Sequence, residues 1–423
     1  MSHAVALIVI MSMAVLAPLL AHAVSRCLAV PLVIFEILLG ILVGPDVLGW
    51  ADTGEVIDVL SQLGLAMLIF LAGYEIQLDR RGGGGWGRSL WAWLIALALG
   101  LGLGTLLAHG GGFDKGVYVG TALTSTALGA ILPVLRDAGD LQSRFGSVMM
   151  TMGSIGEFGP IIAMALLLSG RAPARSAALL AAFAVLTAAA VYWAVRPKPP
   201  WFSRVIAKTL HSSAQFAVRL VMLVLVAMLG LAQALGLDIL LGAFAAGLIT
   251  RLVLAGAAPE SAGTVLSKLE GLGFGFLVPL FFVVTGIEFD LKALLGGGRV
   301  LILLPVFLLL FLLVRGLPMW LLAPRDLGRR DRAALVLFGS TALPLVVAIT
   351  TLGVQDGKVA PGEAAALVGA GMLSVLVFPL VGLRLRAGGS RAGGSQAAAG
   401  GGAEGGAAGA GARAGRVSGD ESW

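Results

Sequence analysis

Long apolar stretches alternate with short polar segments along nearly the whole chain. A helix that crosses a bilayer needs about 20 mostly apolar residues, with about 17 to 25 allowed. Thirteen stretches meet this requirement, so the pattern predicts an all-α polytopic membrane protein. The predicted spans are 4–21, 28–44, 57–75, 88–108, 116–135, 143–169, 174–194, 214–234, 237–253, 265–287, 299–322, 331–352 and 361–385.

Composition supports lipid as the solvent of this protein. Hydrophobic residues make up 58% of the chain and charged residues 12%, whereas soluble domains carry about a quarter charged residues. The net charge is +6, but the basic residues lie in short clusters between apolar stretches, as topology signals do. This distribution argues against a nucleic-acid partner. The sequence has no Walker A pattern and no HExxH pattern, so ATP-driven pumping has no support, and we expect no enzyme.

The basic residues also predict an orientation. An odd number of spans places the two termini on opposite sides of the membrane. With the N-terminus outside, the inner segments up to residue 386 hold eighteen lysines and arginines, and the outer segments hold six. Because basic residues are enriched in cytoplasmic loops, we expect the N-terminus outside and the C-terminus in the cytoplasm of a prokaryotic cell. The Gly/Ala/Ser-rich tail over 387–423 is predicted to be disordered, because it has few large apolar side chains to bury.

A short motif occurs twice. The segment Ser125-Thr126-Ala127-Leu128 recurs as Ser340-Thr341-Ala342-Leu343, each time within an apolar stretch interrupted by glycine and proline. Paired interrupted segments in the two halves of a transporter indicate an ion or substrate site, because unwound backbone there offers carbonyls and half-helix ends. The alternative is chance recurrence of small residues that serve helix packing. The motif falls in the fifth and twelfth spans, and this odd offset of seven predicts two inverted repeats.

Two opposite charges lie at membrane depth near these segments. Glu157 and Arg315 each sit well inside a predicted span, where a charge is unfavourable by about 2.5–3.5 kcal/mol. The repeat offset of 215 aligns Glu157 with Met372 and Arg315 with Gly100, so only one member of each aligned pair is charged. The sequence predicts that Glu157 and Arg315 are charge partners, either in ion coupling or as a static salt bridge.

Two further acidic residues lie close to apolar segments. Glu36, in the second span, is the third charge at membrane depth, and we assign it a supporting role, either lining an aqueous funnel or bonding broken backbone. Asp238 stands at a predicted helix start, where N-capping accounts for it.

Four sequence blocks resemble a known family. They are VPLVIFEILLGILVGPDVLGW, LSQLGLAMLIFLAGYEIQLD, LDILLGAFAAGLI and VPLFFVVTGIEFDL. Together, and in this order, they resemble the monovalent cation:proton antiporters, in the branch of bacterial sodium/proton and potassium/proton exchangers. The resemblance covers residues 1–386.

The resemblance implies a fold of two inverted repeats, with a scaffold bundle that forms a homodimer and a mobile core bundle. The crossing unwound helices of the core would be 116–135 and 331–352. Scaffold helices would occupy 1–87 and 214–290, core helices 88–170 and 291–386, a connecting helix and basic loop 171–213, and the tail 387–423. The family's ion carrier matches Glu157, and its core basic residue matches Arg315.

Three departures from the family pattern bear on the transported ion. The carrier is a glutamate in place of an aspartate, Gly156 stands where other members have an aspartate or glutamine, and Ser340-Thr341 replaces a common Gly-Glu. The expected activity is exchange of Na⁺ or K⁺ for protons by alternating access, one for one, without a cofactor. Expected ligands of the cation are oxygen atoms of Glu157, Thr124, Ser125, Thr126, Ser154, Ser340 and Thr341.

Other activities stay open on sequence alone. The same core could export a small organic cation or a weak acid with proton coupling. A cation channel or a non-transporting homologue is a further alternative, although a channel would need a continuous polar pore and the sequence shows one concentrated polar layer.

Overall fold

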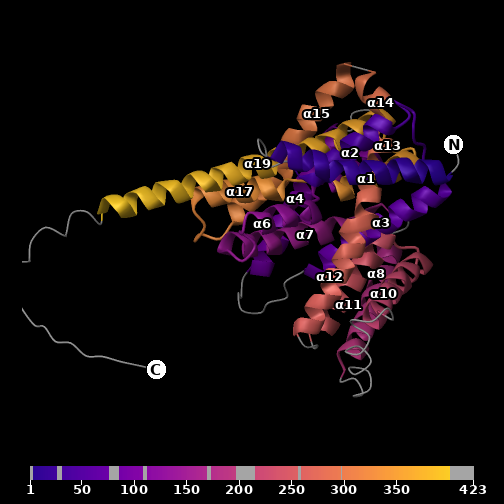
Figure 1. Ribbon diagram of the computed structural model, residues 1–423, viewed down its shortest axis with the longest axis horizontal. Helices are drawn as coiled ribbons and strands as arrows, with labels where there is room; N and C mark the ends of the chain where they lie inside the picture. Colours follow the sequence, from indigo (N-terminus) through magenta and orange to yellow (C-terminus); the bar gives the residue numbers. More distant parts are fainter. Residues whose placement is uncertain are drawn as a thin grey trace, which may run out of the picture.

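A computed structural model describes residues 3–25, 31–75, 85–107, 112–168, 173–196, 215–255, 259–296 and 298–400. The regular elements in these ranges are all helices, as Figure 1 shows. The first half of the described chain contains α1 (His3–Ser25), α2 (Leu32–Val43), α3 (Glu55–Glu75), α4 (Gly85–Leu107), α5 (Gly112–Leu123), α6 (Leu128–Asp137), α7 (Arg144–Leu167) and α8 (Pro173–Val195).

The second half contains α10 (Phe216–Ala234), α11 (Ile239–Leu254), α12 (Pro259–Leu272), α13 (Val278–Ile287), α14 (Leu291–Leu295), α15 (Gly298–Phe311), α16 (Leu317–Leu322), α17 (Arg329–Gly339), α18 (Pro344–Gln355) and α19 (Pro361–Gly400). A π-helical turn, η1 (Gly273–Leu277), joins α12 to α13, and a second, η2 (Leu312–Gly316), joins α15 to α16. Such turns are often found at functional sites.

The helices agree with the predicted all-α membrane fold. Among the described residues, ten helices are long and apolar enough to cross a membrane, and α2 and α11 are shorter apolar helices. The remaining predicted span, 116–135, is divided between α5 and α6. Every predicted stretch therefore has a helical counterpart, and the number of helices that cross the bilayer stays a prediction. Gly236, with φ 65°, makes the turn between α10 and α11, a conformation open to glycine at little steric cost.

Glycines bring the helices of the first and third quarters into close contact. α2 packs against α13, and α3 packs against α11. Gly40 and Gly286 lie at the first crossing, and Gly73 and Gly247 at the second. A Cβ atom on any of the four would collide with a backbone carbonyl of the facing helix. Small residues at such crossings let membrane helices approach closely.

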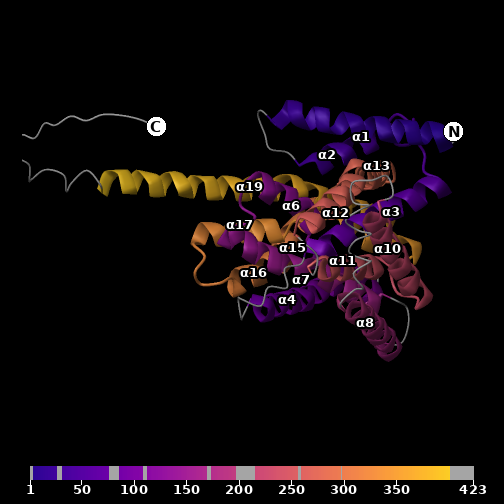
Figure 2. The ribbon, with the colours of Figure 1, turned by 60° about the horizontal axis from the view of Figure 1, so that its bottom comes forward.

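The last helix differs from its prediction. α19 continues to Gly400 and projects beyond the other helices (Figure 1, Figure 2), whereas the sequence predicted disorder from residue 387. Extending an existing helix needs no new nucleus, so the tail residues next to a stable helix continue it. Residues 401–423 of the predicted tail lie outside the described residues. The division into scaffold and core bundles stays a prediction.

Candidate ion-binding site

The two repeated motifs are the points at which two helices are broken. The interruption between α5 and α6 covers residues 124–127, and that between α17 and α18 covers residues 340–343. The two breaks are bonded directly to each other: the Ala127 N–H donates to the Thr341 carbonyl at 2.7 Å, and the Thr126 hydroxyl donates to the Gly339 carbonyl at 2.7 Å. The sequence repeat therefore marks one joint site.

Hydroxyl side chains help to end α5. The Thr124 hydroxyl donates to the Thr121 carbonyl at 2.7 Å, and the Ser125 hydroxyl donates to the Ala122 carbonyl at 2.8 Å. These bonds satisfy carbonyls that a continuing helix would have paired with backbone N–H groups. Each hydroxyl oxygen still has lone pairs with which to accept a bond or meet a cation.

The second break is held by α19. The Ala342 N–H donates to the Ser374 hydroxyl oxygen at 3.0 Å, and the Ser374 hydroxyl lies 2.7 Å from the Gly371 carbonyl. Sequence reasoning missed Ser374. The signal was present, because the residue is a serine inside an apolar span, two positions after the repeat counterpart of Glu157. Pro344 begins α18, at a position where its missing N–H removes no helical bond.

Glu157 lies on α7 beside the first break. The Ser143 hydroxyl caps α7 by accepting from the Gly146 N–H at 3.1 Å. Further along, the Gly156 carbonyl accepts from the Thr126 N–H at 2.9 Å, which fixes this part of α7 against the break. The Glu157 side chain is 2% exposed, and its Oε2 atom has no hydrogen-bond partner.

The start of α6 supplies a favourable environment for a negative charge. The backbone amide of Leu128, the first residue of α6, lies near the Glu157 carboxyl group. Helix N-termini carry a partial positive charge and unpaired N–H groups. A carboxylate at position 157 is therefore supported by a half-helix end.

The structure does not join Arg315 and Glu157 in a static salt bridge, and their coupling during ion exchange stays a prediction. Both residues are described, yet no bridge within 4.0 Å joins them. Arg315 instead donates from Nε to the Thr126 hydroxyl at 2.8 Å and from Nη2 to the Met152 carbonyl at 3.1 Å. The Thr126 hydroxyl in turn donates to the Gly339 carbonyl. Arg315 is therefore bonded to α7 directly and to both helix breaks through Thr126.

Gly156 explains why Arg315 takes this position. A Cβ atom at 156 would meet Nη2 of Arg315 and Oγ1 of Thr126, so the missing side chain leaves room for the guanidinium group. The next side chain, Glu157, leaves α7 about 100° further round the helix. Sequence spacing placed both charges at the correct depth but could not show this difference in direction.

The remaining predicted ligands occupy different places. The Ser340 hydroxyl is fully buried in the second break without a hydrogen-bond partner, and the Thr341 hydroxyl donates to the Leu337 carbonyl at 3.2 Å. Ser154 is buried one turn before Glu157 and donates to Met150 in its own helix at 2.7 Å. The Thr121 hydroxyl, on the last turn of α5, is also buried and unpartnered.

Glu36 lies apart from the bonds that join the two breaks. It is buried on α2 and lines a cavity of about 700 Å³ together with His22, Arg136 and residues of α6 and α13. This placement suits the first of its two expected supporting roles, lining a funnel. Arg136, at the end of α6, lies 3.3 Å from Glu270 and 3.6 Å from Glu75, a cluster that the sequence analysis did not identify.

A second cavity lies at the start of α5 and at the ends of α7 and α18. It measures about 790 Å³ and is lined by Asp114, Tyr118, Asp238, Asp356 and Lys358 among others. The Lys358 ammonium group donates to Asp114 at 2.6 Å, and this bond raises the pKa of Lys358. Asp238 caps α11, as predicted, by accepting from the Leu240 N–H at 2.8 Å.

A bundle of apolar helices with two broken helices bonded at membrane depth, beside a buried carboxyl group, has the architecture of secondary transporters with discontinuous helices. The chain belongs to the family described as "Sodium/hydrogen exchanger, transmembrane", whose model matches residues 11–383. This match confirms the family that the four sequence blocks indicated. It is a family of transporters, not of enzymes.

Named relatives and a solved structure agree with this assignment. The chain is 27% identical over 392 residues to the putative Na⁺/H⁺ antiporter YjbQ of Bacillus subtilis, covering 88% of this chain and 62% of that protein. It is 23% identical over 374 residues to a Na⁺/H⁺ antiporter of Enterococcus hirae, covering 85% and 92%. The structure of the sodium proton antiporter MjNhaP1 from Methanocaldococcus jannaschii superposes with a TM-score of 0.62 at 16% identity, covering 90% and 96%. The fold is thus shared with an antiporter, and the chain spans less than two thirds of the length of the Bacillus subtilis relative.

Proposed function

We propose that this protein exchanges a monovalent cation, Na⁺ or K⁺, for protons across the cytoplasmic membrane. The observation that carries the proposal is the Glu157 carboxyl group, buried beside two bonded helix breaks with one oxygen unpartnered. Charged groups at membrane depth are costly and mark ion pathways and proton relays. A carboxyl group there can hold either a proton or a dehydrated cation, which makes the two ions compete for one position.

Oxygen atoms around the breaks would complete the cation's shell. Alkali cations are hard ions, and hard cations prefer oxygen ligands. The candidate ligands besides Glu157 are Thr124, Ser125, Thr126, Ser154, Ser340 and Thr341. We add Thr121 to these candidates because its hydroxyl, like that of Ser340, is buried and has no hydrogen-bond partner. The Thr126 hydroxyl, in contrast, already forms hydrogen bonds with Arg315 and Gly339.

The charges at the crossing favour exchange of one cation for one proton. Gly156 cannot carry a second acid, and Arg315 keeps its positive charge throughout the cycle, since guanidinium groups are not deprotonated in proteins. Glu75 also acts electrostatically on Glu157, but it lies 3.6 Å from the guanidinium group of Arg136, which compensates its charge. A single carboxyl group that alternates between proton and cation moves no net charge.

The transport cycle we propose is alternating access by a homodimer. The core helices around the breaks would move against the scaffold helices and carry Glu157 from one side to the other. The excess of basic residues in alternate loops supports an N-terminus outside and a C-terminus in the cytoplasm. In this orientation the cavity lined by Asp114 and Asp356 faces outwards, and the one lined by Glu36 faces inwards.

Reconstitution into liposomes tests the proposal. Purified protein is placed in vesicles containing a pH-sensitive dye, an inward-acidic gradient is imposed, and Na⁺, K⁺ or Li⁺ is added outside. Addition of a transported cation should raise the internal pH. Glu157→Gln preserves shape but removes the titratable group, so this response should disappear while the elution profile and melting temperature stay close to wild type. Full proton flux in a folded Glu157→Gln protein would exclude Glu157 as the carrier.

A further inference from the structure

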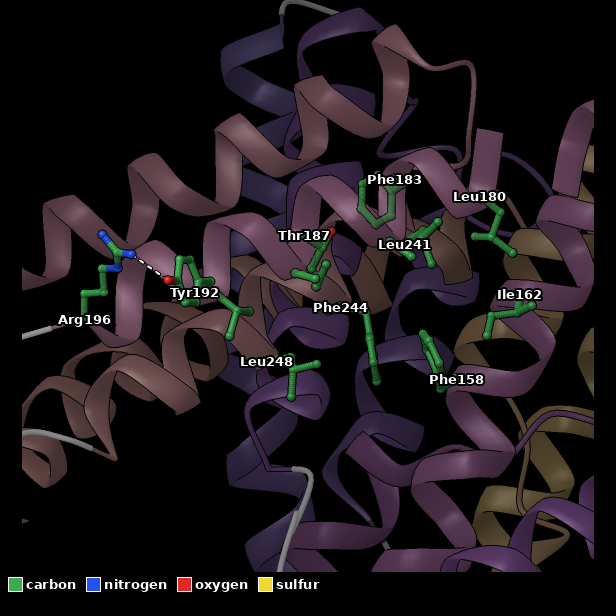
Figure 3. Close-up of a pocket in the computed structure, with 14 residues that line it drawn as sticks. Phe158, Ile162, Leu180, Phe183, Thr187, Tyr192, Arg196, Leu241, Phe244 and Leu248 are labelled. Carbon is green, nitrogen blue, oxygen red and sulfur yellow. Dashed lines mark hydrogen bonds between the residues drawn. The ribbon is translucent and has the colours of Figure 1, made fainter. Parts of the chain in front are cut away.

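An apolar cavity lies apart from the helix breaks. It measures about 860 Å³ and lies between α7, α8 and α11 (Figure 3). Its lining is almost wholly hydrophobic and includes Ile162, Leu180, Phe183, Leu241 and Leu248. An ion has no ligands in such a lining, so an apolar chain is the kind of group that fits it.

One end of this cavity carries a positive charge. Figure 3 shows Arg196 and Tyr192 at one end and Leu180 and Ile162 at the other. Arg196 donates to the Tyr192 hydroxyl at 2.5 Å, and its guanidinium carbon lies 4.5 Å from the Tyr192 ring centre and 5.6 Å from that of Trp193. Among the described residues no carboxylate forms an ion pair with Arg196, so none of them neutralises the charge of its guanidinium group.

The dimensions match one leaflet of a bilayer. Leu180 and Arg196 are sixteen positions apart on or just after α8, which corresponds to about 24 Å of helix at 1.5 Å per residue. Half of a bilayer, including its headgroup region, is about 20–22 Å thick. Tyr192 and Trp193, both largely exposed, stand where interfacial aromatic residues are expected.

α8 is open to the lipid on its outer side. Only 11% of its apolar window is buried within the protein, and the helix lies at the edge of the molecule (Figure 2). A lipid molecule can therefore enter the cavity sideways from the bilayer, without crossing a polar layer.

We propose that this cavity binds an anionic phospholipid, with one acyl chain between α7, α8 and α11 and the phosphate on Arg196. Arginine pairs well with phosphate because its planar N–H groups can donate two parallel bonds. In the orientation proposed above, Arg196 lies at the cytoplasmic leaflet, where anionic lipids attract basic residues.

The bound chain would touch the helix that carries Glu157. Phe158, the next residue, lines the cavity and stacks on Phe244 of α11, with ring centres 4.4 Å apart and planes at 16°. A lipid seated there packs against both rings at the contact between α7 and α11. The lipid is thus placed to stabilise one relative position of these helices.

Photolabelling of the full-length protein tests the site without requiring transport. The probes are phosphatidylglycerol and phosphatidylcholine with the same diazirine-bearing acyl chain, added to protein in phosphatidylcholine nanodiscs. After irradiation, mass spectrometry locates the labelled peptides. The phosphatidylglycerol probe should label residues 180–192 and 241–248 more strongly than the phosphatidylcholine probe.

Two pairs of variants separate the headgroup from the chain. Arg196→Gln should reduce labelling by phosphatidylglycerol about fivefold, as expected for one basic residue near an anionic surface, whereas Arg330→Gln, with the same charge change at an exposed site, should not. Ala188→Phe fills the cavity and should reduce labelling by both probes. Ala189→Phe, next to it but outside the lining, should leave labelling unchanged.

Three results would overturn the proposal. The first is equal labelling of wild type by the two probes, and the second is unchanged phosphatidylglycerol labelling of Arg196→Gln. The third uses a photoreactive phenylalanine analogue at position 188: cross-links to a second copy of the chain, in place of lipid, would assign the cavity to a protein contact.

Discussion

The guanidinium group of Arg315 occupies the space that any side chain at Gly156 would need. A Cβ atom at 156 would meet Nη2 of Arg315 and the Thr126 hydroxyl. Arg315 is bonded there to Thr126 and Met152. These bonds stabilise the buried positive charge of Arg315, and they require that position 156 has no side chain.

Gly156→Ala should therefore destabilise the protein, although alanine is the better helix former. Overpacking a well-filled site costs about 1–3 kcal/mol, and here the displaced group is a buried guanidinium. We expect a lower melting temperature and weak exchange. The control is Gly102→Ala on α4, where a Cβ atom meets nothing within 4 Å, and where stability should be unchanged or higher. Equal melting temperatures for the two variants would contradict the contact.

Thr126 should be the most sensitive hydroxyl in the breaks. Its Oγ1 accepts from Arg315 and donates to Gly339. Thr126→Val keeps the shape but leaves both partners unsatisfied in the interior, at about 1–3 kcal/mol for each unpaired group. Thr126→Ser keeps the hydroxyl and should retain most of the stability and exchange. Thermal unfolding in detergent compares the two, and a Val variant as stable as the Ser variant would exclude this network.

Arg315 should act through its bonds more than through charge coupling to Glu157, since the two residues do not pair. Lysine keeps the charge but cannot reproduce the planar guanidinium geometry. Arg315→Lys and Arg315→Gln should both slow exchange strongly, with the midpoint of the pH profile unchanged. The measurement is dye-based exchange at several pH values. A midpoint shifted in the Gln variant alone would restore the charge coupling that the sequence suggested.

Exchange should be insensitive to membrane potential, because one carboxyl group alternates between two monovalent ions. Liposomes with potential set by a potassium gradient and valinomycin allow Na⁺-driven proton flux to be measured at several voltages. Moving one net charge per cycle would be worth about 2.3 kcal/mol per 100 mV. A flat dependence supports one-for-one exchange, and a steep one would require a second ion-binding group.

Several features of the protein could be predicted from local sequence. The predicted spans follow from the length and hydropathy of each stretch, properties that need no knowledge of neighbours. The helix breaks at Ser125-Thr126 and Ser340-Thr341 follow from local hydroxyl, glycine and proline chemistry. Glu157 and Arg315 could be identified from the sequence, because a charged residue inside an apolar span is rare and unfavourable whatever surrounds it.

Only the tertiary structure decided which groups these residues meet. Whether Arg315 reaches Glu157 or Thr126 depends on the direction in which each side chain leaves its helix and on the space left by Gly156. The bond from Ser374 to the second break and the cavity that ends at Arg196 each join elements that are distant in the chain. Periodicity and composition describe one helix at a time, and the partners of a buried group depend on how several helices are placed together.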